Sequence, residues 1–440
     1  MFQRHALAAL AAFGLAVTVH AQQPERPSAP PVDTQASPGN PGWSIDERTG
    51  CWIWNRNPRA NETVHWSAGC GSDGRASGTG ILEWRVGEQS SRYEGAMADG
   101  KRHGRGALQA QNGGRYEGEF RDDRFHGRGT YVYTNGNRYE GDWREDKFHG
   151  RGVFSGPQFG RYEGNFSEGR LSGHGIREFA SGDRYEGGFR DGRFEGKGRY
   201  VWKDGSSYEG QFASNNFNGR GVRIYSSGAR YEGEWVDDKR EGQGVIVFKG
   251  GDRYEGQWSD NKQSGKGTYV WSEGGRYEGE WRDGNFHGNG VRVFKDGSRY
   301  EGEWLDDKRN GRGSVTYTGG DRYEGEWKDD QRHGRGTYVW TNGNRYEGQF
   351  DAGRRTGQGA FTFANGGRYV GEFRDGTFHG HGVETFSDGS RYEGQYRDGK
   401  PDGQGEAQIR GNYYRGMWVG GCHRDGTRRA AIGRPLAECP

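Results

Sequence analysis

The chain has 440 residues, of which only 30% are hydrophobic, while glycine alone accounts for 85. The usual glycine share is roughly 7%, and so few aliphatic side chains exclude a conventional two-layer hydrophobic core. Lys and Arg number 63 against 61 Asp and Glu, a net charge of +2, so no global field attracts nucleic acid and we expect no nucleic-acid partner. Aromatic residues reach 14% and must supply the burial.

The first 21 residues have the pattern of a signal peptide. Arg4 and His5 precede an apolar run over residues 6–19, and residues 19–21 read Val-His-Ala, the small-x-small form of a signal peptidase site. The apolar run is too short to span a bilayer comfortably. We therefore expect residues 1–21 to be removed and the mature chain to be exported to the periplasm or cell surface.

Residues 22–42 are predicted to form a proline-rich linker. Their prolines stand among small and polar residues, a composition that favours an extended tether over a packed element. The prolines are Pro24, Pro27, Pro30, Pro31, Pro38 and Pro41.

From Tyr93 onwards the tripeptide Tyr-Glu-Gly, or a one-residue variant of it, recurs every 23 residues without insertion or deletion. A fixed period of this length predicts a stacked array of one small supersecondary unit, which presents an extended surface rather than a catalytic pocket. We number the positions of each unit from this tyrosine. The fourteen tyrosines are Tyr93, Tyr116, Tyr139, Tyr162, Tyr185, Tyr208, Tyr231, Tyr254, Tyr277, Tyr300, Tyr323, Tyr346, Tyr369 and Tyr392.

Each unit reads as a β-hairpin. Positions 1–5 alternate aromatic and polar residues, the period of a strand. Positions 6–10 are rich in turn residues, and position 8 is Gly, Asp or Asn in all fourteen units, types that tolerate a left-handed backbone. A second strand is predicted from about position 12 to 18, and glycine at position 21 of twelve units turns the chain into the next hairpin. The predicted fold class is all-β: an elongated, twisted, open, single-layer antiparallel β-meander of about 15 hairpin repeats.

Glycine also occupies positions 3, 12 and 14 in all fourteen units, although these positions fall within the predicted strands. Strand glycine usually marks a bulge, a kink or the close approach of another group. We infer that the missing side chains make room for rings at positions 1 and 5, the arrangement called aromatic rescue. On the other face, Glu at position 2 and the Arg that precedes the tyrosine in thirteen units predict a ladder of cross-strand opposite charges.

The consensus Tyr-Glu-Gly-Glu-Trp, a turn and then Gly-x-Gly, in a 23-residue register, resembles the MORN repeat, named for membrane occupation and recognition nexus. The resemblance covers residues 93–413, and a shortened fifteenth unit starts at Tyr414. It implies a sheet used for binding proteins or lipids, for scaffolding and for self-association, with any catalysis in a separate domain. Outside the array no segment is long enough for such a domain, so we expect neither enzyme activity nor a cofactor.

Degenerate segments flank the repeats. Gly69, Gly78 and Gly80 fit positions 3, 12 and 14 of an imperfect unit that begins near Ser67. The predicted organisation is an N-terminal cap over residues 43–91, the repeat array over residues 92–420 and a C-terminal cap over residues 421–440.

Four cysteines flank the array, Cys51 and Cys70 before it and Cys422 and Cys439 after it. An even count in an exported chain favours disulfides. Three pairings are open, and we prefer the local pairs, Cys51 with Cys70 and Cys422 with Cys439, because a long array holds its two ends apart. Zinc is the rival interpretation, but no Cys-x-x-Cys spacing occurs, so we expect no metal.

Recurring polar residues do not suggest catalysis. Histidines at position 11 lie in successive hairpins, two strands or roughly 10 Å apart, whereas ligands of one metal lie about 2 Å from it. The glycine-rich segments lack the Lys-Ser/Thr of a phosphate loop, and no Ser, Cys or Thr lies in a nucleophile elbow. The histidines are His103, His126, His149, His287, His333 and His379.

The aromatic rows are the candidate binding residues. Two interpretations stay open: a ring ladder that substitutes for a core, which we favour, or a groove in which part of each ring is open to a ligand. The candidates at position 5 are Trp235, Trp258, Trp281, Trp304 and Trp327, and those at position 1 are Tyr231, Tyr254, Tyr277, Tyr300 and Tyr323.

The expected function is a non-enzymatic scaffold of the periplasm or cell surface that binds a protein partner along the sheet. The alternatives are carbohydrate or peptidoglycan binding through the aromatic ladder, since exposed rings stack on sugar faces, and binding to a phospholipid surface. We also expect a homodimer formed through one end of the array, because unpaired edge strands are templates for pairing.

Overall fold

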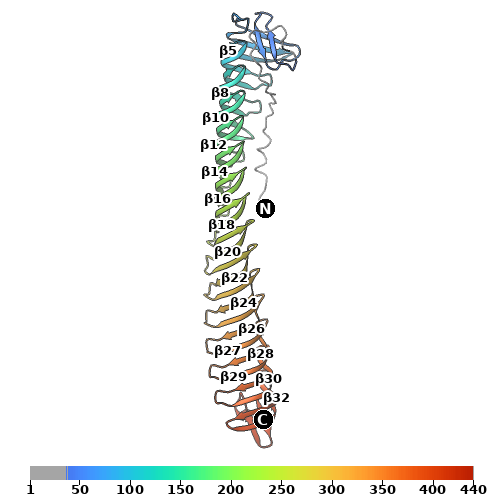
Figure 1. The fold of residues 1–440 in the computed structure, drawn as a ribbon, viewed down its shortest axis with the longest axis vertical. Helices are drawn as coiled ribbons and strands as arrows, with labels where there is room; N and C mark the ends of the chain where they lie inside the picture. Colours follow the sequence, from blue (N-terminus) through green and yellow to red (C-terminus); the bar gives the residue numbers. More distant parts are fainter. Residues whose placement is uncertain (1–35, 37, 440) are drawn as a thin grey trace. The chain divides into compact units, whose positions relative to one another are not determined.

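The computed structural model describes residue 36 and residues 38–439, which fold almost entirely into antiparallel β-strands. The expected signal peptide and most of the linker therefore lie outside the described residues. Two compact units divide the chain: Met1–Ser226 with Trp235–Asp238, and Ser227–Glu234 with Lys239–Pro440. Figure 1 shows the hairpins of each unit following one another in sequence order.

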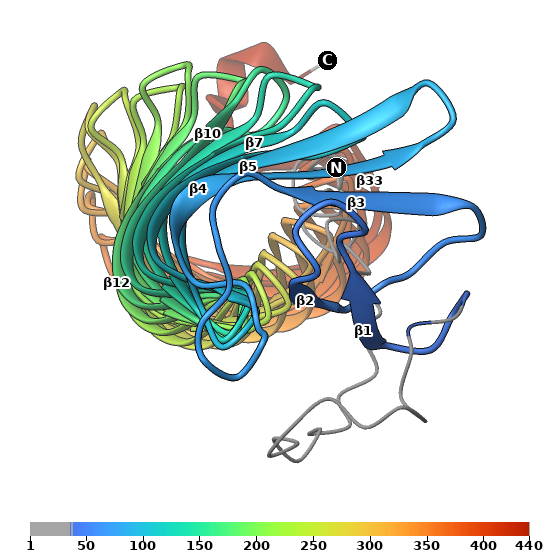
Figure 2. The ribbon, with the colours of Figure 1, turned by 90° about the horizontal axis from the view of Figure 1, so that it is seen from above.

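Strands of the first unit pair antiparallel with their sequence neighbours, apart from β1 and β2, which form a separate two-stranded sheet beside the stacked strands (Figure 2). The strands are β1 (Gly42–Ile45), β2 (Trp52–Asn55), β3 (Glu62–Trp66), β4 (Gly78–Val86), β5 (Gln89–Ala98), β6 (Lys101–Gln109), β7 (Arg115–Arg121), β8 (Arg124–Val132), β9 (Arg138–Arg144), β10 (Lys147–Gly156), β11 (Gly160–Ser167), β12 (Arg170–Glu178), β13 (Arg184–Arg190), β14 (Arg193–Val201), β15 (Ser207–Ala213) and β16 (Asn216–Ile224). Strand β17 (Arg230–Val236) contains residues of both units.

The second unit repeats the same antiparallel order and ends in a short 3-10 helix, η2 (Leu436–Glu438). Its strands are β18 (Lys239–Val247), β19 (Arg253–Ser259), β20 (Lys262–Val270), β21 (Arg276–Arg282), β22 (Asn285–Val293), β23 (Arg299–Leu305), β24 (Lys308–Thr316), β25 (Arg322–Lys328), β26 (Gln331–Val339), β27 (Arg345–Asp351), β28 (Arg354–Thr362), β29 (Arg368–Arg374), β30 (Thr377–Thr385), β31 (Arg391–Arg397), β32 (Lys400–Ile409), β33 (Asn412–Val419), β34 (Cys422–Asp425) and β35 (Arg428–Ala431). The predicted all-β meander of hairpins is confirmed, with β3 paired to β4 and β35 to β34 at its ends.

The hairpin turn is tighter than predicted. In the hairpin β25–β26 only Asp329 and Asp330 lie between the strands, with φ of 46° and 67°. Two consecutive left-handed residues form the type I′ turn, whose twist matches that of the flanking strands. The second strand therefore begins at position 9, here Gln331, and the prediction of a start near position 12 was wrong.

The glycine at position 12 marks a β-bulge. In the β25–β26 pair the register shifts between Gly325 and Glu326, so that Gly334 and Arg335 have no partner on β25. Gly334 has a φ of 54°, a left-handed conformation that favours glycine. A Cβ atom at Gly334 would also lie 2.3 Å from Oε2 of Glu326, so this site faces a carboxylate and not a ring.

The glycines at positions 3 and 14 make room for the tyrosine ring, as predicted. A Cβ atom at Gly336 would lie 2.5 Å from the Tyr323 ring, closer than real contacts allow. The ring is fixed over this site because its hydroxyl donates a 2.8 Å hydrogen bond to the carbonyl of Glu326. Tyr323 is 1% exposed, so aromatic rescue is confirmed for position 1.

Both predicted disulfides are present. Cys51 is bonded to Cys70, with 5.3 Å between their Cα atoms, and Cys422 is bonded to Cys439, with 5.5 Å. In the predicted N-terminal cap the ring of Trp66 lies over Gly80, where a Cβ atom would be 2.8 Å from it. Among the described residues, none of the helices has the length and apolar character needed to cross a bilayer.

Candidate binding surface

The ten candidate aromatic residues are buried. The five indoles of Trp235, Trp258, Trp281, Trp304 and Trp327 are 3–6% exposed, and the phenols of Tyr231, Tyr254, Tyr277, Tyr300 and Tyr323 are at most 1% exposed. The indole nitrogen donates to the glycine carbonyl at position 14 of the preceding unit, as from Trp327 to Gly313 at 3.1 Å. Tyr300 and Trp327 pack edge to face at 5.4 Å. These rings form the core, and the interpretation as an open groove was wrong for them.

Position 10 supplies the cover over the rings. Where it is phenylalanine, its ring stacks on the tyrosine of its own unit, as Phe286 does on Tyr277 at 3.8 Å. Where it is arginine, the guanidinium lies over the same ring row, as Arg309 does over Trp327 at 4.2 Å. Burial raises the pKa of the ladder phenols, including that of Tyr346 to about 12. The rings at positions 1 and 5 are therefore covered by side chains of the array itself.

Charged residues of strand one pair mostly within the strand, while the predicted cross-strand pairs form at Arg128–Asp142, Arg199–Glu209 and Arg415–Glu406. The Arg before the tyrosine and the Glu at position 2 are alternate residues and so share a face. Both partners are about half exposed, so each pair contributes little to stability. The pairs are Arg92–Glu94, Arg138–Glu140, Arg161–Glu163, Arg184–Glu186, Arg230–Glu232, Arg253–Glu255, Arg299–Glu301, Arg345–Glu347 and Arg391–Glu393.

We call the series of two-residue turns at positions 7 and 8 the turn row. Along it, the cation at position 9 of one unit pairs with the acid at position 7 of the next, which joins neighbouring hairpins by their side chains. These pairs are Arg124–Glu145, Lys147–Glu168, Arg170–Asp191, Lys239–Asp260, Lys262–Asp283, Lys308–Asp329 and Arg354–Asp375.

Position 8 has a second role that the sequence interpretation missed. The backbone N–H of Phe286 donates to Oδ1 of Asp307 at 2.8 Å, while the N–H of Asp307 donates to the carbonyl of Phe286 at 3.1 Å. An Asp or Asn at position 8 therefore both adopts the left-handed turn and braces the preceding unit. The occurrence of Asp or Asn in place of Gly at position 8 was the sequence feature that could have indicated this hydrogen bond.

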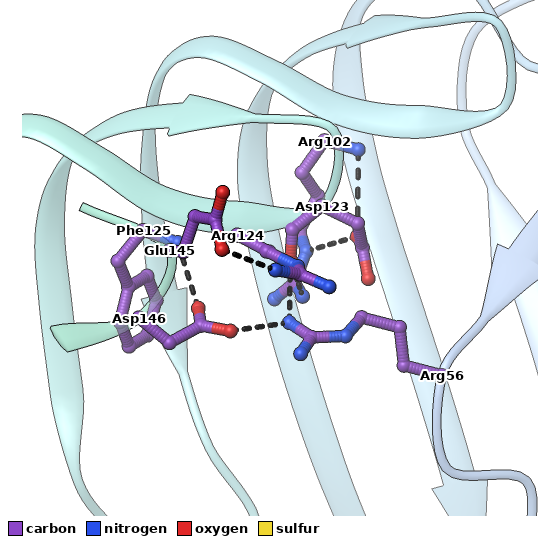
Figure 3. A network of polar contacts seen from close by, with 7 residues as sticks. All are labelled: Arg56, Arg102, Asp123, Arg124, Phe125, Glu145 and Asp146. Carbon is purple, nitrogen blue, oxygen red and sulfur yellow. Dashed lines mark hydrogen bonds and ion pairs between the residues drawn. The ribbon is translucent and has the colours of Figure 1, made fainter. Parts of the chain in front are cut away.

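Residues 43–56, which we call the N-terminal segment, dock on the first three turns of the row. The N–H of Trp54 donates to the carbonyl of Gly100 at 2.8 Å. Figure 3 shows Arg56 reaching from this segment to the next two turns, where its Nη1 donates to the Asp123 carbonyl at 3.2 Å and to Oδ2 of Asp146 at 2.7 Å. In the same network Nε of Arg102 donates to Oδ1 of Asp123 at 2.6 Å.

A hollow of about 530 Å³ opens at the turns between hairpins of the second unit. It is lined by Trp271, Arg292 and Phe294 and by the carboxylates of Asp252 and Asp296, among other residues. The guanidinium of Arg292 lies 4.8 Å from the Trp271 ring and 4.6 Å from the Phe294 ring, so it covers the aromatic faces there. Within the described residues, no group of three or more His, Cys, Asp or Glu could hold a metal ion.

The antiparallel hairpins, the buried ring ladder and the strict spacing define a β-hairpin repeat protein. The chain belongs to the MORN-repeat family, and MORN repeats in a β-meander fit a scaffold or binding role. The MORN repeat model matches residues 93–115, 116–138, 139–161, 162–184, 185–207, 208–230, 231–253, 254–276, 277–299, 300–322, 323–345, 346–368, 369–391 and 392–408.

No curated protein matches the chain. Among solved structures, the TCP10 domain of Danio rerio CPAP in complex with a peptide of Danio rerio STIL is 9% identical, covers 50% of this chain and 92% of its own, and has a TM-score of 0.28. The SAS-4 (dCPAP) TCP domain in complex with a proline-rich motif of Ana2 (dSTIL) of Drosophila melanogaster is 12% identical, covers 40% and 90%, and has a TM-score of 0.22. These likenesses are too distant to carry an argument.

Proposed function

We propose that the chain is a non-enzymatic scaffold, exported to the periplasm or cell surface, that binds a protein partner on the polar surface of its repeat array. The observation that carries this proposal is the recurrence, at 23-residue intervals, of the same exposed polar groups on a β-meander. A regular row of charges and backbone carbonyls suits a polypeptide partner, which offers matching groups at regular intervals.

Two disulfides support export, because disulfides persist in oxidising compartments and are rare in the cytosol. Burial of the position 5 and position 1 rings weighs against the glycan alternative in the form that uses the aromatic ladder, since stacking on sugar needs an open ring face. The near-zero net charge weighs against binding to an anionic phospholipid surface.

Cross-linking in cells through exposed lysines at position 9, such as Lys262 and Lys308, followed by mass spectrometry, tests the proposal. The expected result is one discrete protein neighbour joined to the array. No neighbour, despite efficient labelling of these lysines, would overturn it. Purified cell-wall material and anionic vesicles serve as parallel baits, and retention of the folded chain on either one would favour the corresponding alternative.

A further inference from the structure

The N-terminal segment shows what the turn row can bind. Over Gly100 the space is filled by this segment: a Cβ atom there would lie 2.6 Å from the Trp43 ring and 2.8 Å from the carbonyl of Trp52. Trp54 and Arg56 then run along the row and engage the turns at Gly100, Asp123 and Asp146. Residues 52–56 are thus a strand followed by one arginine, bound at position 8 of three successive units.

Guanidinium binding is a general property of position 8, because arginines of the array use the same acceptors elsewhere. Arg309 donates from Nη2 to the Asp330 carbonyl at 2.9 Å and from Nε to Oδ1 of Asp330 at 3.0 Å. Nη2 of Arg332 donates to the carbonyl of Gly353 at 2.9 Å. Arg56 comes from outside the repeats and joins two turns, because it bonds the carbonyl of Asp123 and the carboxylate of Asp146.

The turns of Gly192, Asn215 and Asp238, all in the first unit, resemble the docked turns of Gly100, Asp123 and Asp146, with an amide in place of the middle carboxylate. Phe217 N–H donates to Oδ1 of Asp238 at 2.7 Å, and the N–H of Asp238 donates to the Phe217 carbonyl at 3.1 Å. The corresponding distances at Asp146 are 2.8 Å and 3.1 Å. The local geometry that presents the carboxylate is therefore the same.

These three turns lack the cover that the docked turns have. A Cβ atom at Gly192 would meet nothing within 4 Å, and Asp238 is exposed, whereas the side chain of Asp146 is 28% exposed beneath Arg56. The residues at position 10 of the units before Asn215 and Asp238 are Phe194 and Phe217, which bring no guanidinium.

We propose that the turns of Gly192, Asn215 and Asp238 dock an extended arginine-bearing segment of the partner protein, in the way that the N-terminal segment docks on Gly100, Asp123 and Asp146. The partner's arginine takes the place of Arg56 and bonds the Asn215 carbonyl and the Asp238 carboxylate. This inference rests on the proposed function, since it names the kind of partner segment.

The test uses the full chain and a ¹⁵N-labelled peptide that copies residues 50–58 with the Cys51→Ser change. Its dissociation constant is measured by NMR titration at low salt, next to a peptide in which citrulline replaces the arginine. We expect the citrulline peptide to bind about fivefold more weakly, as for the loss of a partly exposed charged hydrogen bond. Asp238→Asn should lower the affinity of the arginine peptide by the same factor.

Matched variants separate this site from general charge effects. Asp330→Asn removes an equal charge at a turn already filled by Arg309, so the affinity should not change. Arg56→Met should expose the Asp146 carboxylate and add a second binding site. Equal affinity for the two peptides, or an affinity unchanged by Asp238→Asn, would overturn the proposal.

The variants are also carried into the cellular cross-linking experiment. A partner recovered equally well from the wild type and from Asp238→Asn would refute the docking site while leaving the scaffold function standing. Conversely, arginine-dependent peptide binding in vitro with no cross-linked neighbour in cells would leave the site standing and refute the function.

Discussion

At the residue scale, two aspartates at position 8 differ in how much their ion pairs are shielded from water. The Arg102 and Asp123 side chains are 13% and 4% exposed, while those of Arg309 and Asp330 are 20% and 47% exposed. Burial alone would lower the pKa of Arg102, but the Asp123 carboxylate outweighs it and raises that pKa. The pair beneath the N-terminal segment is therefore the one on which local stability depends.

We expect Asp123→Asn to destabilise the hairpins β5–β8 by about 3 kcal/mol, because it leaves a buried guanidinium without its counter-charge. Asp330→Asn should cost about 1 kcal/mol or less, since water screens the more exposed pair. Native-state hydrogen exchange of the backbone amides in the two regions measures both values. Equal effects of the two substitutions would contradict this assignment.

Glu384 provides a pH-dependent prediction. Burial raises the pKa of its carboxyl, and Tyr396 donates to Oε2 at 2.9 Å. A carboxyl whose folded pKa is raised favours the protonated form, so its stabilising effect is complete below the unfolded pKa, about 4.3, and is lost as the pH rises through the folded pKa. Glu384→Gln keeps an acceptor for Tyr396 and should raise the melting temperature at pH 7 but not at pH 4. A gain of equal size at both pH values would exclude this explanation.

At the scale of the single hairpin, the fit between tyrosine and glycine can be tested by one methyl group. Gly336→Ala places a Cβ atom 2.5 Å from the Tyr323 ring, which is held by its hydroxyl, so we expect a loss of about 1–3 kcal/mol by overpacking. Gly319→Ala is the control, because a Cβ atom there meets nothing within 4 Å. Hydrogen exchange in β25 and β26 reports the difference, which should vanish if the ring can move aside.

The repeat period and its glycines were enough to predict the hairpin meander and the ring over Gly336, because both depend on contacts within one unit. The predicted start of the second strand was wrong because the two-residue turn and the bulge at Gly334 together give the sequence pattern of a longer loop. The closed state of the ring face depends on side chains from neighbouring units. Arg56 contacts Asp123 and Asp146, which lie 67 and 90 residues further along the chain. Local sequence patterns do not predict contacts over such separations.

At the scale of the whole molecule, a disulfide lies in each segment that flanks the array. The cysteines of each bond are 19 and 17 residues apart, and loops of this length predict about 3 kcal/mol of stabilisation per bond. We expect Cys51→Ser with Cys70→Ser to increase hydrogen exchange in β1–β4 and to promote aggregation, while exchange in β20–β26 stays unchanged. A uniform increase along the chain would show that the caps and the array unfold together.

The predicted homodimer through an array end concerns the same segments. Edge strands with unpaired backbone groups are templates for association, and β3 and β35 are the terminal strands of the pairing order. Light scattering across a wide concentration range tests this, and a constant monomer mass would refute it.

The strict 23-residue period also sets how the protein should respond to tension. If the chain is pulled from its ends in an optical trap, hairpins should rupture one at a time, each releasing 23 residues, or about 75–80 Å of contour length. Rupture force should be lower at junctions with glycine at position 8, such as Gly376, than at those braced by a carboxylate, such as Asp307. A single force trace would then show low rupture forces at turns with glycine and high rupture forces at turns with aspartate, in their order along the turn row.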